Sequence, residues 1–248
     1  TRFRVTIQPV LEAVEPATPP RAVVVAGTGP TADRLAWRLR EAGLDPKPTG
    51  ERPGDAVAAP ALRTVPLAVV VGHFVLDPEF FGLWLRRDIP HLPIVFGDAS
   101  VRIGPLIEPG NGPCLYCLER HRTDADPAWP AIASQLWGRR SAAETPFLAS
   151  EAATMAARIV ERRLAGTALP GGGVGRAATG PVKSYTIDAA TGATRRRSHV
   201  RHPECSCAGI VEPPVSVPVQ PGTGSAHSRR PARPPTPTTR GGGLSVPA

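Results

Sequence analysis

Four cysteines constrain the fold of this chain more than any other feature, because they form two tight pairs that lie far apart. Cys114 and Cys117 belong to the segment PCLYC, and Cys205 and Cys207 belong to HPECSC. A turn can present two thiolates at once, and four thiolates complete the tetrahedral coordination that zinc prefers. The pairs therefore predict a structural zinc site that joins distant segments. Such a site has no open position for a substrate, so we do not expect a catalytic metal.

Other states of the cysteines stay open at this point. Disulfide bonds need an oxidising compartment, whereas the sequence contains neither a signal-peptide pattern nor an apolar run that could span a membrane. A redox pair and unconnected thiols are further alternatives. The Cys-Ser-Cys spacing is tighter than the usual two-residue gap, so His202, three residues before Cys205, is an alternative fourth ligand. We expect a cytoplasmic protein that does not interact with membranes.

The chain is basic, with 29 Lys and Arg residues against 21 Asp and Glu residues and a formal net charge of +8. Nucleic-acid sites combine a basic face with aromatic stacking partners. Only 5% of the residues are aromatic, and the arginines are scattered. The composition therefore argues against nucleic-acid binding, and an acidic peptide partner is at least as compatible with the charge.

Strand and helix patterns alternate in the first hundred residues. Residues 22–26 are a β-branched run typical of a buried parallel strand, and apolar residues at helical spacing follow up to residue 39. Residues 67–71 and 92–96 are further buried strands, separated by a helix over residues 78–87. Residues 45–64 are read as loop with one weak strand. This alternation predicts an α/β fold with a parallel sheet.

The pattern changes after residue 100. Residues 101–107 form a strand that leads into the first cysteine pair. A helix over residues 126–136 is expected to bury Trp129, Ile132, Ala133 and Leu136. A longer helix over residues 146–164 is expected to bury Phe147, Ala152, Met155, Ala156 and Ile159. Residues 182–187 and 193–199 form a hairpin that delivers the chain to the second cysteine pair.

These patterns divide the chain into three segments. Residues 1–20 are a connector or the remnant of a truncated domain, since the chain begins with Thr rather than Met. Residues 21–210 form the α/β domain with the zinc site. Residues 211–248 lack apolar periodicity and are rich in Pro, Gly, Ser, Thr and Arg, so we expect a disordered tail.

The turn after the first strand carries a weak nucleotide-binding fingerprint. Gly27, Gly29 and Ala32 match the positions for a tight turn, a close phosphate and helix packing. A working site also needs an acid at the end of the next strand to hold a ribose. The corresponding stretch, residues 46–50, has none. We therefore interpret the motif as a degenerate, structural turn.

Two further groups of polar residues can be interpreted either as functional sites or as ordinary structural features. His73 and Asp98 follow predicted strand ends, where α/β sheets bind ligands, and could serve acid–base chemistry. Because the sequence shows no third catalytic partner, we favour structural roles, with His73 hydrogen-bonded within the fold and Asp98 capping a turn. Residues 119–126 form a dense polar run, which is either a solvated helix end or a charged surface for a partner protein.

Together these features resemble a known family. The glycine turn in an α/β sheet, the PCLYC pair and the late cysteine pair are similar to the ThiF-like, ubiquitin-activating-enzyme-like fold. More closely, residues 104–130 (GPLIEPGNGPCLYCLERHRTDADPAWP) followed by HPECSC resemble the partner proteins of azoline-forming cyclodehydratases. These proteins act in the biosynthesis of thiazole/oxazole-modified, bacteriocin-type peptides (TOMM). The resemblance covers residues 20–210, and residues 104–130 are its most specific part.

The resemblance implies a Rossmann-like ThiF-type fold with a zinc-stapled C-terminal hairpin, in which structural Zn2+ is held by Cys114, Cys117, Cys205 and Cys207. Such proteins bind the leader of a precursor peptide, often through an N-terminal winged-helix clamp. They deliver it to a YcaO-type enzyme, which uses ATP to cyclise Cys, Ser or Thr side chains onto the backbone. Family members commonly pair, so a homodimer is compatible with the resemblance, although the sequence does not specify the oligomeric state.

Two departures from the wider family bear on function. Adenylating members carry an acid after the second strand and Arg and Lys residues that contact ATP, and this sequence shows no matching motif. ATP binding is therefore disfavoured, and a non-catalytic subunit of a cyclodehydratase complex is favoured. A winged-helix clamp would precede residue 20, so either the chain is truncated or another protein supplies the clamp. The alternatives are an ATP-dependent adenylyltransferase acting on a peptide or carrier-protein terminus, and a standalone zinc-containing binding domain.

Overall fold

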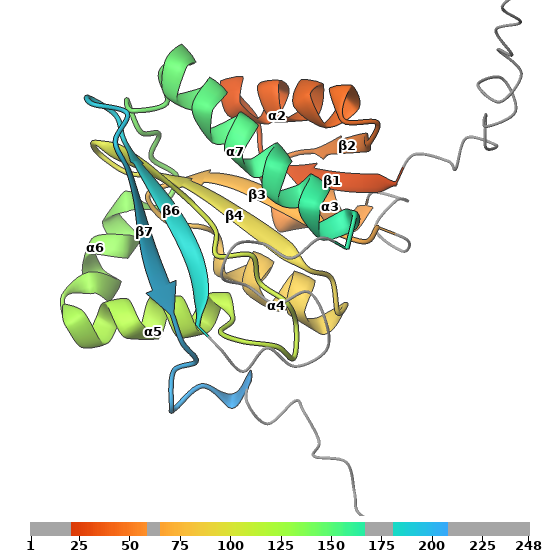
Figure 1. Ribbon diagram of the computed structural model, residues 1–248. Helices are drawn as coiled ribbons and strands as arrows, with labels where there is room; N and C mark the ends of the chain where they lie inside the picture. Colours follow the sequence, from red (N-terminus) through yellow and green to blue (C-terminus); the bar gives the residue numbers. More distant parts are fainter. Residues whose placement is uncertain (1–20, 59–64, 167–180, 208–248) are drawn as a thin grey trace, which may run out of the picture. The chain divides into compact units, whose positions relative to one another are not determined.

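The computed structural model describes residues 21–58, 65–166 and 181–207 (Figure 1). The predictions for residues 1–20 and 211–248 lie outside these ranges. The described chain forms a mixed α/β structure with a seven-stranded sheet and six helices. None of the helices in these ranges is long and apolar enough to cross a membrane.

The first four strands are parallel, as the buried β-branched runs predict. They are β1 (Ala22–Ala26), β2 (Asp45–Thr49), β3 (Ala68–His73) and β4 (His91–Phe96), in the sheet order β2-β1-β3-β4. Because β2 and β3 lie on opposite sides of β1, the carboxyl ends of β1 and β3 form the topological switch point of the sheet. The glycine turn begins there.

The weak strand expected between residues 45 and 64 is β2, with the sequence DPKPT. Two of its five residues are prolines, which cannot donate to a strand ladder. The sheet tolerates them because β2 is an edge strand with β1 as its single neighbour.

Helices cover both faces of the sheet. In Figure 1, α2 (Pro30–Glu41) and α7 (Pro146–Leu164) lie together on one face, and α3 (Pro53–Ala58), α4 (Pro78–Arg86), α5 (Leu115–Ala125) and α6 (Trp129–Leu136) lie on the other. Successive residues of β1 serve opposite faces: Val23 and Val25 belong to the core beneath α2 and α7, whereas Val24 packs with Trp84 of α4. Burial on both faces explains why the strands are continuous apolar runs.

The C-terminal half adds three antiparallel strands, β5 (Ser100–Ile103), β6 (Val182–Asp188) and β7 (Thr194–His199). The predicted hairpin is confirmed, and it turns at Gly192, whose φ is 69°. The strand expected over residues 101–107 is shorter than predicted. Ile107 still pairs with the start of β4 through an isolated bridge.

Two burial predictions are wrong. No residue of α6 is fully buried, because this helix packs at the periphery against α5, where the indole Nε1 of Trp129 donates to Glu119 at 2.7 Å. Phe147 is 86% exposed, because the buried stripe of α7 begins at Leu148. The remaining residues expected inside α7 do face the core.

A buried histidine links the stability of this core to pH. His91 in β4 is 1% exposed, and its Nδ1 lies 2.9 Å from the carbonyl oxygen of Ile89. Its Nε2 has no hydrogen-bond partner among the described residues. Burial lowers the pKa of His91 from 6.5 to about 4. The folded chain therefore keeps the ring neutral at pH values where the unfolded chain protonates it.

We expect the free energy of unfolding to fall as the pH decreases from about 6.5 to about 4, because the unfolded state then binds the additional proton. The substitution His91→Asn keeps a donor for the Ile89 carbonyl but removes the titration. Denaturant titrations should therefore show a weaker pH dependence for the variant over this window. His199, whose pKa burial also lowers to about 4, contributes equally in both proteins. Identical slopes would contradict a neutral, buried His91.

Candidate functional site

The glycine turn after β1 has the geometry that its sequence predicts. Gly27 has a φ of 129°, and a Cβ there would lie 2.7 Å from the carbonyl oxygen of Val71 in β3. Gly29, with a φ of 98°, precedes the first residue of α2. Ala32 is buried where α2 packs on the sheet. The three positions therefore combine a tight turn, an exposed backbone and a closely packed helix start.

An acidic residue that the sequence analysis missed follows the second strand. β2 ends at Thr49, and the carboxylate of Glu51 accepts a hydrogen bond from the Thr28 hydroxyl in the glycine turn. In dinucleotide sites, an acid at this place holds a ribose. The prediction that no acid follows the second strand is therefore wrong. The proline-rich strand has no periodic pattern to mark its end, and Glu51 lies one residue beyond the stretch 46–50.

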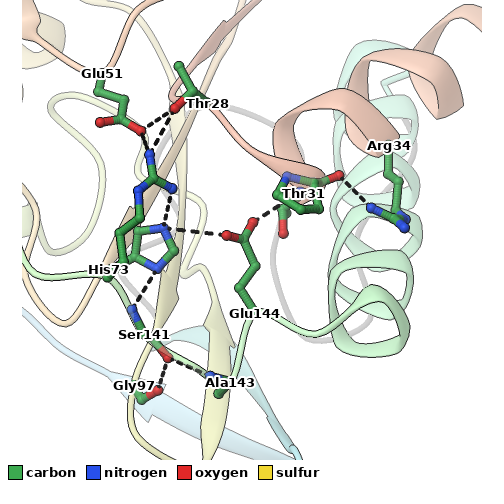
Figure 2. Close-up of polar contacts among 11 residues, drawn as sticks. Thr28, Thr31, Arg34, Glu51, His73, Gly97, Ser141, Ala143 and Glu144 are labelled. Atoms are coloured by element: carbon green, nitrogen blue, oxygen red, sulfur yellow. Dashed lines mark hydrogen bonds and ion pairs between the residues drawn. The ribbon is translucent and has the colours of Figure 1, made fainter.

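Side chains from the segment before α7 fill this turn. Glu144 points into the first turn of α2, where its Oε1 accepts a hydrogen bond from the backbone N–H of Thr31 at 3.0 Å (Figure 2). The Arg140 guanidinium forms an ion pair with Glu51 and donates to the Thr28 hydroxyl at 3.0 Å. Helix N-termini of such folds bind phosphate. Glu144 thus occupies the position where a phosphate would bind. Arg140 pairs with Glu51, the acid that could otherwise hold a ribose.

The charges of this network oppose a further anion. Glu51 and Glu144 supply two carboxylates, of which Arg140 neutralises one. His73, at the end of β3, adds no compensating charge at neutral pH, because burial lowers its pKa despite the opposing effect of Glu144. The backbone N–H of Ser141 donates to its Nδ1 at 3.3 Å, and its Nε2 lies 3.5 Å from Glu144 and 3.4 Å from the Arg140 guanidinium. A triphosphate would meet an uncompensated carboxylate at the helix N-terminus.

His73 and Asp98, which the sequence places at strand ends where acid–base chemistry could occur, have no described contact with each other. Asp98 is exposed in the turn between β4 and β5. The partners of His73 come from the segment before α7 instead, and the Ser141 hydroxyl donates to the carbonyl oxygen of Gly97 (Figure 2). These bonds hold that segment against the carboxyl edge of the sheet.

The four cysteines lie together, with their Sγ atoms within 4.8 Å of one another. Cys114 and Cys117 begin α5, and Cys205 and Cys207 follow β7. Their Sγ atoms are 3.7 Å apart for Cys114 and Cys117, 3.7 Å for Cys114 and Cys205, and 3.4 Å for Cys117 and Cys207. Sulfur atoms that surround one zinc ion lie about 3.8 Å apart, and those of a disulfide about 2 Å. The cluster therefore fits a tetrahedral metal and not disulfide bonds.

His202, the alternative ligand, does not belong to this cluster. Its Nδ1 accepts a hydrogen bond from the backbone N–H of Glu204 at 3.2 Å, and its Nε2 lies 2.7 Å from Oδ2 of Asp124. With Nδ1 as the acceptor, Nε2 carries the proton and donates it to Asp124, so His202 is engaged away from the four sulfur atoms. A hydrogen bond from Cys114, together with one from the backbone of His202, lowers the pKa of Cys117 to about 4, whereas the same contact raises the pKa of Cys114 and burial raises that of Cys207.

The polar run over residues 119–126 is neither fully solvated nor entirely free for a partner. Glu119 accepts a hydrogen bond from Trp129, and burial raises its pKa. Asp124 holds His202. Part of this run therefore fixes α5 to α6 and to the second cysteine segment.

Solved structures share this fold. The heterocyclase TruD matches with a TM-score of 0.55 and 21% identity over 77% of this chain and 28% of that chain. A heterocyclase in complex with substrate and cofactor matches with a TM-score of 0.53 and 16% identity, over 76% and 25% of the two chains. Escherichia coli MccB with SeMet MccA matches with a TM-score of 0.52 and 14% identity, over 76% and 66%.

At these identities the likeness concerns the fold alone. The chain spans little more than a quarter of the heterocyclase TruD. No protein-family model matches the sequence, and no curated protein matches it significantly.

The cysteine geometry generates a metal prediction. We expect the reduced, folded chain to hold one zinc ion, measured by elemental analysis. Cys117→Ser should lose the metal and lower the Tm by about 10 °C or more, because zinc binding and folding are coupled.

His202→Gln is the matched control, because it keeps an acceptor near the Glu204 N–H and leaves the four sulfurs untouched. It should retain the full zinc content. Zinc-free wild-type protein, or zinc lost in His202→Gln and kept in Cys117→Ser, would contradict a four-sulfur site.

Proposed function

We propose that this chain is a non-catalytic accessory protein that helps to present a ribosomal precursor peptide to a YcaO-type, ATP-dependent cyclodehydratase. The support comes from the sequence of residues 104–130, which resembles cyclodehydratase partner proteins, and from the fold, which is similar to that of the heterocyclase TruD. The products of such a complex are thiazoline and oxazoline rings in a bacteriocin-like peptide.

The single observation that carries the non-catalytic role is the filled glycine turn. An adenylating enzyme must bind the ATP phosphates at the N-terminus of α2, where Glu144 already bonds the Thr31 N–H and is itself only 6% exposed. The neighbouring Glu51 is engaged by Arg140. Binding ATP here requires moving a buried carboxylate and breaking an ion pair, so the turn serves as a structural joint.

A structural zinc fits the same role. Held by Cys114, Cys117, Cys205 and Cys207, it would supply a fixed cross-link between the start of α5 and the end of β7. Neither segment packs deeply in the main core. The cross-link makes the hairpin a rigid part of the scaffold on which a peptide or a partner enzyme can dock.

An ATP-dependent adenylyltransferase acting on a peptide or carrier-protein terminus is the second candidate. The position of Glu51 favours it, because an acid at this strand end, together with Gly27 and Gly29, restores the three parts of the fingerprint. The two candidates differ in what Glu144 and Arg140 do. In the accessory protein they close the turn, whereas in the enzyme they would move aside when ATP binds.

We expect the isolated chain to show no ATP–pyrophosphate exchange and no calorimetric binding of Mg-ATP. Glu144→Gln removes the opposing charge and keeps an acceptor for Thr31, so its affinity for ATP should rise by about tenfold or more. Asp98→Asn, the same change at an exposed residue of the same sheet edge, should have no effect. Exchange activity in the wild-type chain would select the adenylyltransferase.

The accessory role is tested directly by reconstitution with a YcaO-type enzyme and a precursor peptide. Mass spectrometry should show faster loss of water from the precursor when the chain is added, with Glu51→Gln as effective as wild type. An enzyme that works equally well without this chain would contradict the proposed function.

A further inference from the structure

The sheet ends in a strand whose outer edge is open. β7 is the last strand in the order β2-β1-β3-β4-β5-β6-β7, and no described segment pairs with its far side. Five of its six residues are exposed. Such an edge offers unpaired N–H and C=O groups to an added strand.

The register shows which groups are free. The backbone N–H of Asp188 donates to the carbonyl oxygen of Ala193 at 3.0 Å beside the hairpin turn. Because antiparallel pairs alternate, the N–H and C=O groups of Thr194, Arg196 and Ser198 point away from β6. The open stretch ends at Val200, whose carbonyl oxygen lies 3.2 Å from Nε2 of His121. A segment of about six residues can therefore pair along this edge.

The positive charge of β7 determines which kind of peptide can pair with this edge. Arg195, Arg196 and Arg197 are consecutive and exposed, and none of them forms an ion pair with a described residue. Arg195 and Arg197 lie on one face of the strand, and Arg196 lies on the other. Charged edges prevent self-association, and a second copy of β7 would place arginines opposite arginines. An acidic strand would pair with them on both faces.

We propose that the free edge of β7 binds an extended acidic peptide segment, which adds to the sheet as an eighth strand. Backbone hydrogen bonds to Thr194, Arg196 and Ser198 fix its register, and acidic side chains pair with the three arginines. The proposal goes beyond the accessory function and does not depend on it, because the edge binds such a peptide whether or not a cyclodehydratase is present.

Fluorescence anisotropy of the full chain with a labelled peptide of about twelve residues, in which Glu alternates with Val, tests this inference. We expect saturable binding that weakens as the salt concentration rises from about 50 to about 500 mM. The same peptide with N-methyl groups on alternate backbone nitrogens keeps its charge but cannot pair, so it should bind at least about tenfold more weakly. A Lys–Val peptide should not bind.

Variants of the chain locate the site. Arg195→Glu combined with Arg197→Glu should weaken binding by about tenfold or more, whereas Arg40→Glu combined with Arg52→Glu, an equal charge change at exposed positions elsewhere, should not. Ser198→Pro removes an outward N–H without breaking a bond to β6, so it should weaken binding relative to Ser198→Ala. Retained zinc content verifies that each variant is folded.

Three outcomes would overturn the proposal. These are no binding of the acidic peptide, equal affinity for its N-methylated form, and displacement by single-stranded DNA of equal charge at equal concentration. The second would reduce the edge to a non-specific cationic patch. The third would make it a nucleic-acid surface.

Discussion

The close approach of four sulfur atoms is the constraint on which the C-terminal half of this structure depends. The parallel strands β1, β3 and β4 are buried between helices and need no further support. The hairpin of β6 and β7 lies at the sheet's edge, and much of it is exposed. What fixes its far end is the cluster of Cys114, Cys117, Cys205 and Cys207, whose members come from segments about ninety residues apart. Bonds from Arg201 to Gly110 and Gly112, and from His202 to Asp124, support the same junction.

At the carboxyl ends of β1 and β3, a glycine turn of the nucleotide-binding type is filled by side chains of the chain itself. Its glycines keep the backbone geometry that a phosphate site requires, but the helix N-terminus is satisfied from within the chain by Glu144. An internal carboxylate offers the same favourable interaction with the helix dipole as a bound anion. Arg140 then balances Glu51, and His73 remains neutral within the network. The segment before α7 is thereby anchored to β1, β3 and β4 by side chains of the chain itself.

Much of this architecture could be predicted from the sequence, because buried strands and spaced cysteine pairs leave strong local patterns. The runs around Val24 and Val70, the hairpin turn at Gly192 and the joining of the two cysteine pairs are confirmed. The role of Glu51 could not be predicted, since the edge strand before it has no apolar periodicity. Nor could the contact between Glu144 and Thr31, which lie 113 residues apart and meet only in the folded chain. The exposure of Phe147 and of α6 also could not be predicted, because it depends on which segments pack against them in the folded chain.

We infer that a metal bound by the four cysteines holds the C-terminal part of this fold and that Glu144 closes the glycine turn to nucleotides. A crystal structure of the wild-type chain, grown with Mg-ATP and measured at the zinc absorption edge, tests both parts at once. We expect an anomalous peak amid the four sulfurs, with Glu144 still bonded to the Thr31 N–H and no nucleotide at the glycine turn. A nucleotide bound at Gly27 and Gly29 with Glu144 displaced, or the absence of the anomalous peak, would contradict it.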